Sequence, residues 1–241
     1  MDIGHAIRHT ILSPAFLETV AQSSIDGVLV LAQGTYVYCW GEHGQVTTKI
    51  VTPSAVRVAF TQEPLDSGFL PSSVVRTGTS AAGDFCVAFY PPARHPIPLL
   101  TETGTQLVTV PLPGMVLVGI GQTYSLWSVR CATFSPTATV YAAPLPNVYH
   151  NGQVCWGRNI PPLAHPTTMD AAWELVLTTP FTRELAAHKC VSAPQDVRNV
   201  LATLARRHAR TFPQRELVTA GPSITVADLV DCILKKEEPT R

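Results

Sequence analysis

The chain has 241 residues, and its 17 basic and 17 acidic side chains give a formal net charge of zero. Such a chain is not held to nucleic acid or membrane by net charge, and its 46% apolar and 14% charged composition excludes intrinsic disorder of the whole chain. No apolar run reaches the ~20 residues that span a bilayer, and the N-terminus lacks a basic segment followed by an apolar one. We therefore expect a folded, cytoplasmic protein.

The first part of the chain predicts a β arm followed by a short helix. Residues 25–38 and 45–51 are rich in Val, Tyr and Thr and are separated by glycines, a pattern typical of a β-hairpin or meander. Thr52 then offers an N-cap with a proline after it, which predicts a short helix over 55–61. We expect residues 1–51 to form a β extension ahead of the main domain.

Strand signals recur through the middle of the chain. Runs rich in β-branched and aromatic residues lie at 74–77, 85–90, 107–110, 115–120, 124–134 and 137–142. Prolines between these runs argue against long helices. Gly119 and Gly121 are interpreted as part of a turn, because a dinucleotide-binding fingerprint needs a third glycine where Tyr124 stands.

Helix signals follow the strands. Amphipathic patterns predict helices over 167–178, 196–210 and 225–236. In the second helix we expect a buried face and arginines that stay in water, because buried guanidinium groups without partners are costly. The buried set is Val197, Val200, Leu201 and Leu204, and the exposed set is Arg206, Arg207 and Arg210. Strands first and helices last indicate an α+β fold, with a core over residues 52–215 and a C-terminal helix and tail over 216–241.

Cysteines, histidines and an arginine run carry weaker signals. Cys39-x-x-x-His43 and His188-x-Cys190 are each half of a zinc site at most, so we expect no metal and no cofactor. The run 206–210 is interpreted as a solvated helix face and at most an interaction patch. The scattered cysteines fit free thiols in a reducing compartment; they are Cys39, Cys86, Cys131, Cys155, Cys190 and Cys232.

The segment LPNVYHNGQVCW, residues 145–156, combines a rigid turn, a side-chain amide and a cysteine. Pro146 fixes its own φ and Gly152 permits a left-handed turn, so the chain can fold back between them. This brings Asn147 toward Cys155. A carboxamide N–H in that place can donate to the oxyanion that forms when an acyl group on sulfur is attacked. From the residues alone, the alternative is an inert loop cysteine.

The pattern Pro-Asn-Val-Tyr-x-x-Gly-x-Val-Cys, which ends at Cys155, resembles the active-site signature of ubiquitin-conjugating (E2) enzymes, His-Pro-Asn-[Ile/Val]-x-x-x-Gly-x-[Ile/Val]-Cys. Order and spacing both agree. An E2 enzyme also runs from a short helix through a four-stranded meander and the active-site loop to further helices, similar to the order predicted here. The resemblance implies an E2-like α+β fold in which an antiparallel β-meander packs against helices.

A closer resemblance, over about residues 52–188, is to the prokaryotic E2-like proteins called PRTRC system protein B. Bacterial mobile cassettes encode them with a ThiF-like, E1-related adenylating enzyme. Besides the loop, the similar residues are Tyr141-Ala142-Ala143-Pro144, Gly157, Ile160-Pro161, Ala172-Trp173-Glu174 and Pro180-Phe181-Thr182.

The resemblance implies roles for two residues. Cys155 would accept the C-terminus of a ubiquitin-like protein as a thioester from the E1-like partner and pass it to an amine, and Asn147 would order the loop or assist aminolysis. In place of the signature histidine stands Leu145, whose apolar side chain can fill similar space. Trp156-Gly157-Arg158 replaces the Leu-Asp-Ile-Leu type of flank, which bears on the partners that dock there. His150 either lowers the pKa of the thiol or has no role.

Two other functions stay open. A catalytically inactive adaptor would keep the E2-like fold to assemble a complex, although the presence of both Asn147 and Cys155 favours chemistry. A nucleic-acid-binding accessory rests on the 206–210 run alone, and the zero net charge makes nucleic acid an unfavoured partner. The β extension has either a dimerisation or a docking role.

Overall fold

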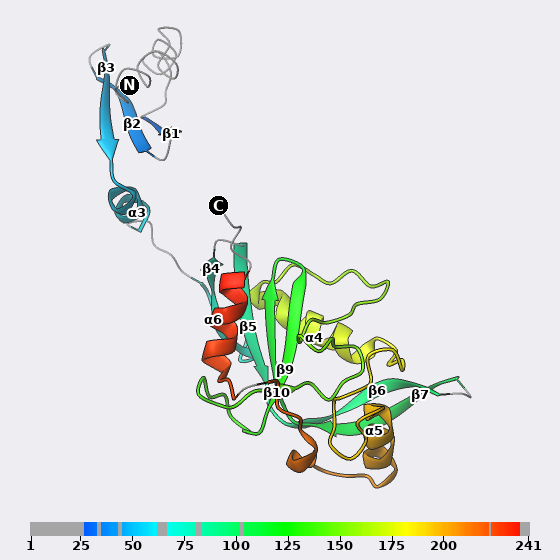
Figure 1. Ribbon diagram of the computed structural model, residues 1–241. Helices are drawn as coiled ribbons and strands as arrows, with labels where there is room; N and C mark the ends of the chain where they lie inside the picture. The colour runs from blue at the N-terminus through cyan, green and yellow to red at the C-terminus, as the bar shows by residue number, and fades with distance from the viewer. Residues whose placement is uncertain are drawn as a thin grey trace. The chain divides into compact units, whose positions relative to one another are not determined.

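The computed structural model of the chain (Figure 1) describes residues 27–32, 35–42, 45–61, 67–80, 83–101, 104–221 and 223–236. The chain divides into two compact units, residues 1–68 and 69–241. Over the described ranges, no helix is long and apolar enough to cross a lipid bilayer.

The described part of the N-terminal unit contains a small antiparallel sheet followed by a helix. The strands β1 (Val28–Ala32), β2 (Thr35–Glu42) and β3 (Gln45–Val51) pair in chain order, which confirms the predicted β arm as a meander. Helix α3 (Pro53–Thr61) follows, and its predicted N-cap is present: the Ala55 N–H donates to Thr52 Oγ1 at 3.2 Å. The expected domain boundaries after residues 51 and 215 stay predictions.

The larger unit is built on a five-stranded antiparallel sheet with the order β10-β9-β8-β5-β4. Its strands are β4 (Val74–Ser80), β5 (Gly83–Tyr90), β8 (Gly114–Ile120), β9 (Thr123–Val129) and β10 (Tyr141–Ala142). A two-stranded hairpin, β6 (Ala93–Thr101) with β7 (Gly104–Leu112), lies between β5 and β8 in the sequence.

This hairpin continues the β5–β8 pair across a break. The last β5–β8 pair, Tyr90 with Met115, and the first β6–β7 pair keep the same register. Prolines at 91, 92 and 113 stand at the break, where they cannot donate ladder hydrogen bonds. The predicted four-stranded meander is therefore present, with its two middle strands interrupted by proline.

Strand β6 is not indicated by the sequence patterns because Pro96 and Pro98 interrupt it. The two prolines lie two residues apart, so their nitrogens face the same edge of β6, away from β7. The ladder with β7 therefore loses no donor. The Pro98 carbonyl, on the outer edge, instead accepts a hydrogen bond from the Phe181 N–H at 2.8 Å. Proline is thus tolerated in β6 because only the outer edge loses donors.

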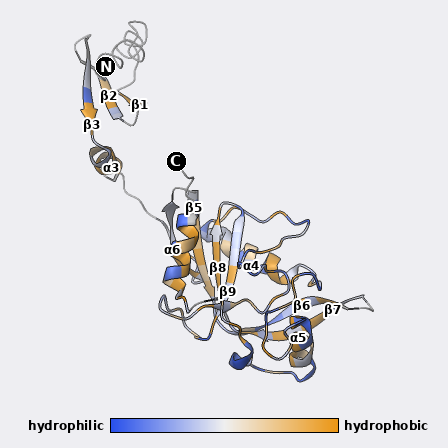
Figure 2. Ribbon diagram, viewed as in Figure 1, coloured by the Kyte–Doolittle hydropathy of each residue, from blue (hydrophilic) through white to orange (hydrophobic). Residues whose placement is uncertain are grey.

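Apolar layers cover both faces of the sheet. On one face, Cys86, Leu117 and Leu126 belong to a core shared with α4 (Met169–Thr178) and α5 (Val197–Arg206). On the other, Val87, Val116 and Val129 pack with α6 (Val226–Lys236). Figure 2 shows hydrophobic colouring along the central strands. Two buried faces explain why β5 and β8 read as continuous apolar runs rather than alternating ones.

The three predicted helices correspond to α4, α5 and α6. The expected buried face of α5 is confirmed, and Arg206, Arg207 and Arg210 are exposed as predicted. Helix α5 ends at Arg206, earlier than predicted, because the backbone turns left-handed at His208 with φ of 48°.

Two predicted strands are too long. The strand expected over 124–134 ends at Val129, and the one expected over 137–142 shrinks to β10. The residues before β10 pair instead with the segment that leads into α6, where the Val140 N–H donates to the Ile224 carbonyl at 3.0 Å. This long-range partner has no local sequence signal.

Candidate active site

The segment that carries Cys155 folds into a tight hairpin. Val148 and Val154 form an antiparallel bridge, and both are buried. The Cys155 N–H donates to the Asn147 carbonyl at 2.8 Å, and the Tyr149 N–H donates to the Gln153 carbonyl at 2.8 Å. The fold-back between Pro146 and Gly152 therefore exists, and it joins Asn147 to Cys155 through the backbone.

The hairpin is fixed to the open edge of β9. The Leu126 N–H donates to the Gly152 carbonyl and the Val154 N–H donates to the Tyr124 carbonyl, each at 2.8 Å. Gly152 has φ of +85°, and a Cβ there would lie 2.1 Å from Cζ2 of Trp127. Only glycine permits both this backbone conformation and this contact with the Trp127 indole.

Cys155 is half-buried and has a hydroxyl neighbour. The Tyr149 hydroxyl donates to Cys155 Sγ at 3.7 Å. This contact raises the pKa of the Tyr149 phenol, so the hydroxyl keeps its proton and remains a donor at neutral pH. Sequence reasoning quoted Tyr149 in the motif but gave it no role. Side chains alternate between the two sides of a hairpin, and this alternation places positions 149 and 155 on the same side. It is the sequence signal that could have identified Tyr149 as a neighbour of the thiol.

Asn147 serves as an anchor between the hairpin and α4. Its side chain is 6% exposed, and its Nδ2 donates to the Val176 carbonyl at 3.1 Å. Its Oδ1 is buried without a hydrogen-bond partner among the described residues. The contact with Val176 favours the loop-ordering role over direct donation to an oxyanion.

The flanks of the hairpin are also packed. Leu145 is fully buried in the core, in agreement with an apolar side chain that fills the space of the signature histidine. The rings of Trp156 and Tyr124 meet edge to face, with their centroids 5.4 Å apart. Beyond it, the Ala164 N–H donates to the Gly121 carbonyl at 2.6 Å, so the segment after Cys155 is held at the predicted β8–β9 turn.

A buried lysine lies behind the hairpin. Lys189 is 2% exposed, and its Nζ donates to the Tyr149 carbonyl at 3.3 Å. Burial lowers the pKa of this amine to about 8. No ion pair to Lys189 occurs within the described ranges. Sequence reasoning missed Lys189, since a single lysine beside a cysteine has no pattern that indicates burial.

His150 lies beside another histidine rather than beside the Cys155 thiol. Its ring centroid lies 5.6 Å from that of His188, whose backbone is left-handed with φ of 60°. The structure gives no contact between His150 and Cys155 that would carry an effect on the thiol.

The other cysteines are less suited to chemistry. Cys39, Cys86 and Cys190 are buried, and burial raises the pKa of Cys86 to about 11 and that of Cys190 to about 12. Cys131, expected in a strand, lies beyond the end of β9 and is half-buried. Cys232 is exposed on α6.

The two residue pairs considered as partial zinc sites, Cys39 with His43 and His188 with Cys190, are not joined by further metal ligands in the described part of the chain. No group of three or more His, Cys, Asp or Glu side chains that could hold a metal gathers there. His43 lies outside the residues whose side chains are described.

Comparison with known proteins adds one finding. The model of prokaryotic E2 family D matches residues 48–220, which include the meander, the hairpin and helices α4 and α5. Neither curated proteins nor solved structures gave a significant match.

Proposed function

Because the chain belongs to prokaryotic E2 family D, we propose that it is an E2-like conjugating enzyme that uses Cys155. The observation that supports this most is the hairpin, which holds a half-exposed thiol beside the Tyr149 hydroxyl at 3.7 Å. The resemblance to PRTRC system protein B makes a ThiF-like, E1-related adenylating enzyme and a ubiquitin-like protein the partners.

In the first step, the Cys155 thiolate attacks the thioester carbonyl of the loaded E1-like enzyme. A new carbon–sulfur bond forms as the E1 thiolate leaves. In the second step, a neutral amine attacks the same carbonyl, Cys155 leaves as thiolate, and the attacking nitrogen releases a proton to solvent, which yields an amide. The Tyr149 hydroxyl, as a donor near sulfur, stabilises the departing thiolate.

A loading assay tests the first step. The full chain is mixed with ATP, the adenylating enzyme and the ubiquitin-like protein, and the adduct is followed on gels with and without thiol. We expect a thiol-sensitive adduct that Cys155→Ser replaces by a thiol-resistant oxyester or by none. Cys232→Ser, at an exposed cysteine on α6, is the matched control and should load normally. A thiol-sensitive adduct at the wild-type level in Cys155→Ser would show that Cys155 is not the nucleophile and would favour the adaptor.

Asn147→Ala is expected to leave loading largely intact and to slow discharge to an amine by roughly ten- to a hundredfold, because the hairpin loses its buried anchor on α4 and holds Cys155 less well in position. Single-turnover discharge of the loaded chain measures this rate. Asn159→Ala is the matched control, since Asn159 Nδ2 donates to Thr179 Oγ1 at the end of α4 from an exposed position. Equal discharge rates in Asn147→Ala and wild type would exclude a role for Asn147.

A further inference from the structure

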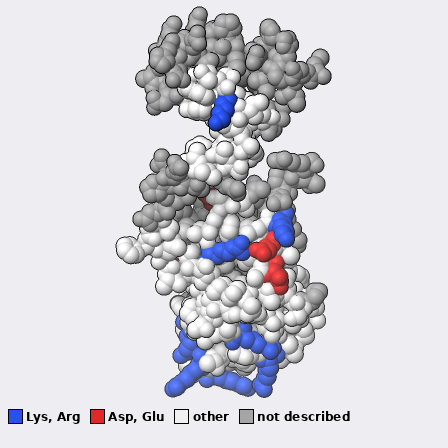
Figure 3. Space-filling view, turned by 90° about the vertical axis from the view of Figure 1, so that its left-hand side faces the viewer, with Lys and Arg blue, Asp and Glu red and all other residues white. Residues whose placement is uncertain are grey.

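Helix α5 is surrounded by arginines. They lie on the helix, just after it, or in the hollows beside it, and they are Arg94, Arg183, Arg198, Arg206, Arg207, Arg210 and Arg215. We call this set the arginine surface. Figure 3 shows basic side chains gathered at the end of the larger unit where α5 lies, with no acidic side chain among them on that face. The arginines come from β6, from the segment before α5, and from α5 and its C-terminal flank.

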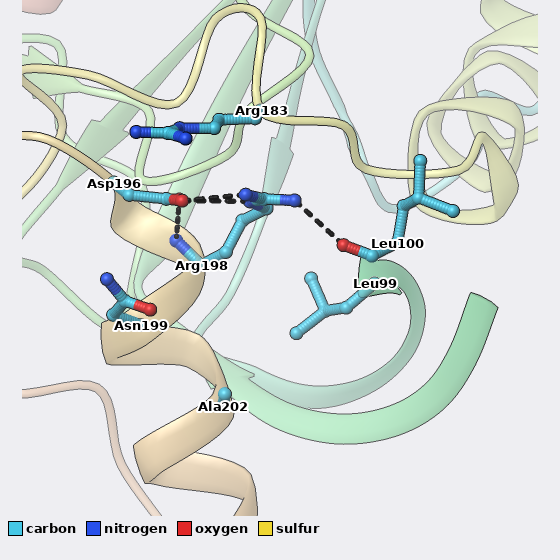
Figure 4. Close-up of a pocket in the computed structure, with 7 residues that line it drawn as sticks. All are labelled: Leu99, Leu100, Arg183, Asp196, Arg198, Asn199 and Ala202. Atoms are coloured by element: carbon cyan, nitrogen blue, oxygen red, sulfur yellow. Dashed lines mark hydrogen bonds and ion pairs between the residues drawn. The ribbon is translucent and has the colours of Figure 1, made fainter. Parts of the chain in front are cut away.

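Two acidic side chains that line the hollows of this surface, Asp196 and Glu216, are already engaged. Arg198 Nη2 pairs with Asp196 Oδ2 at 2.7 Å, and Arg198 also donates to the Leu100 carbonyl (Figure 4). The carboxylate of Glu216, which is 8% exposed, accepts the Ser192 N–H at 2.9 Å. Neither carboxylate is available to the rest of the arginine surface.

Most of the guanidinium groups are therefore unpaired. Arg94, Arg207, Arg210 and Arg215 are exposed and make no ion pair within the described ranges. Arg183 lies beside the Asp196–Arg198 pair in Figure 4 and adds a further positive charge. A cluster of exposed like charges has no stabilising role in the isolated chain, and it favours an anionic partner.

Three hollows of about 450, 390 and 360 Å³ separate these arginines. Arg183 and Arg198 line the first, Arg207 and Arg215 the second, and Arg94 and Arg206 the third. A guanidinium at the rim of a hollow can bind a carboxylate with two parallel hydrogen bonds. The second and third hollows thus each offer two such groups to an acidic side chain, and the first offers Arg183, because Arg198 is already paired with Asp196.

Protein is a better match than nucleic acid. Among the described residues, no Phe, Tyr or Trp lines any of the three hollows, so this part of the arginine surface lacks the stacking platforms used for single strands. Acidic residues also lie elsewhere, with Asp170 and Glu174 on α4, while the two aspartates of α6 are accompanied by Lys235 and Lys236. On a chain with a net charge of zero, a local concentration of arginines suits docking of an acidic protein segment in one orientation.

We propose that the arginine surface around α5 binds a segment rich in Asp and Glu on a protein partner. This interaction is separate from the chemistry assigned to Cys155, so it does not rest on the proposed function. Residues on the arginine surface set the orientation and the association rate of the partner.

Fluorescence anisotropy of the full chain with a labelled decaglutamate peptide tests the proposal, with a ten-nucleotide single-stranded DNA as the charge-matched rival. We expect the peptide to bind more tightly than the DNA and to weaken as salt rises from about 50 to about 200 mM. In Arg207→Glu/Arg210→Glu, peptide binding should weaken at least about tenfold. Both residues are exposed and unpaired, so the variant should unfold at the wild-type urea concentration.

The control is Arg158→Glu/Lys235→Glu, which changes the net charge equally at two exposed residues outside the arginine surface. Its peptide affinity should change by less than about twofold. Equal weakening in both variants would reduce the effect to net charge, tighter binding of DNA would assign the surface to nucleic acid, and absence of peptide binding would remove the surface as a docking site. Each of these results overturns the proposal.

Discussion

Replacing Gly152 by alanine is expected to destabilise the larger unit by about 2 to 5 kcal/mol, the sum of a left-handed backbone penalty and an overpacking penalty. The reason is geometric. Gly152 has φ of +85°, and an added Cβ would meet the Trp127 ring at 2.1 Å. Because the Trp127 indole is buried within the sheet layer that packs on α6, it has little room to yield. Urea unfolding measures the loss.

Gly157→Ala is the matched control on the other side of Cys155. Gly157 also has a positive φ, +59°, but no atom lies within 4 Å of the position of its Cβ. We expect it to cost only the backbone term, about 1 to 2 kcal/mol. If the two variants were equally stable, the close contact between Gly152 and Trp127 would not exist in solution, and the attachment of the hairpin to β9 would be wrong.

Lys189→Met is expected to stabilise the protein by about 1 to 3 kcal/mol near pH 7, because it removes a charged amine from a buried site. The pH dependence gives the sharper test. The pKa of Lys189 is lowered from 10.5 to about 8 in the folded chain. Between these values the unfolded chain holds a proton that the folded chain has released. This difference makes the contribution of Lys189 to the free energy of unfolding of the wild type rise with pH between these two values. The total rise is about 3 kcal/mol.

The difference between the two chains isolates this contribution. Burial raises the pKa values of Cys86 and Cys190, and their contributions fall above about pH 9, but they are common to wild type and variant. Urea unfolding of both chains from about pH 7 to about pH 10.5 should show the advantage of Lys189→Met shrinking toward zero. Lys235→Met, which removes an exposed lysine, is the matched control measured over the same pH range. A constant difference for Lys189→Met would show that Lys189 is not buried as described.

Local patterns were sufficient for the helices, for the central strands and for the position of the candidate site. Apolar periodicity marked α4, α5 and α6, and Pro146 and Gly152 marked the turn that brings Cys155 back to Asn147. The strands at the edges were harder. Strand β6 is hidden by prolines whose nitrogens face its outer edge, and β10 is shortened because its neighbours pair with residues before α6.

The contacts that surround Cys155 depend on distant residues and have no sequence pattern. Asn147 was expected either to order the loop or to assist aminolysis, and the contact of its amide with Val176 on α4, which favours the first role, had no sequence signal. Lys189 reaches the hairpin from 40 positions further along the chain. Such contacts are fixed by the packing of the hairpin between β9 and α4, which only the tertiary structure specifies.

Single-turnover mass spectrometry of the loaded chain tests the central claim most directly. The chain is loaded with the ubiquitin-like protein, separated from the adenylating enzyme, and mixed with free lysine. We predict an adduct, one water lighter than the sum of its two proteins, that maps to the peptide containing Cys155 and disappears as a lysine amide of the ubiquitin-like protein forms. An adduct on any other residue, or a chain that binds both partners and never gains the adduct mass, would contradict the account.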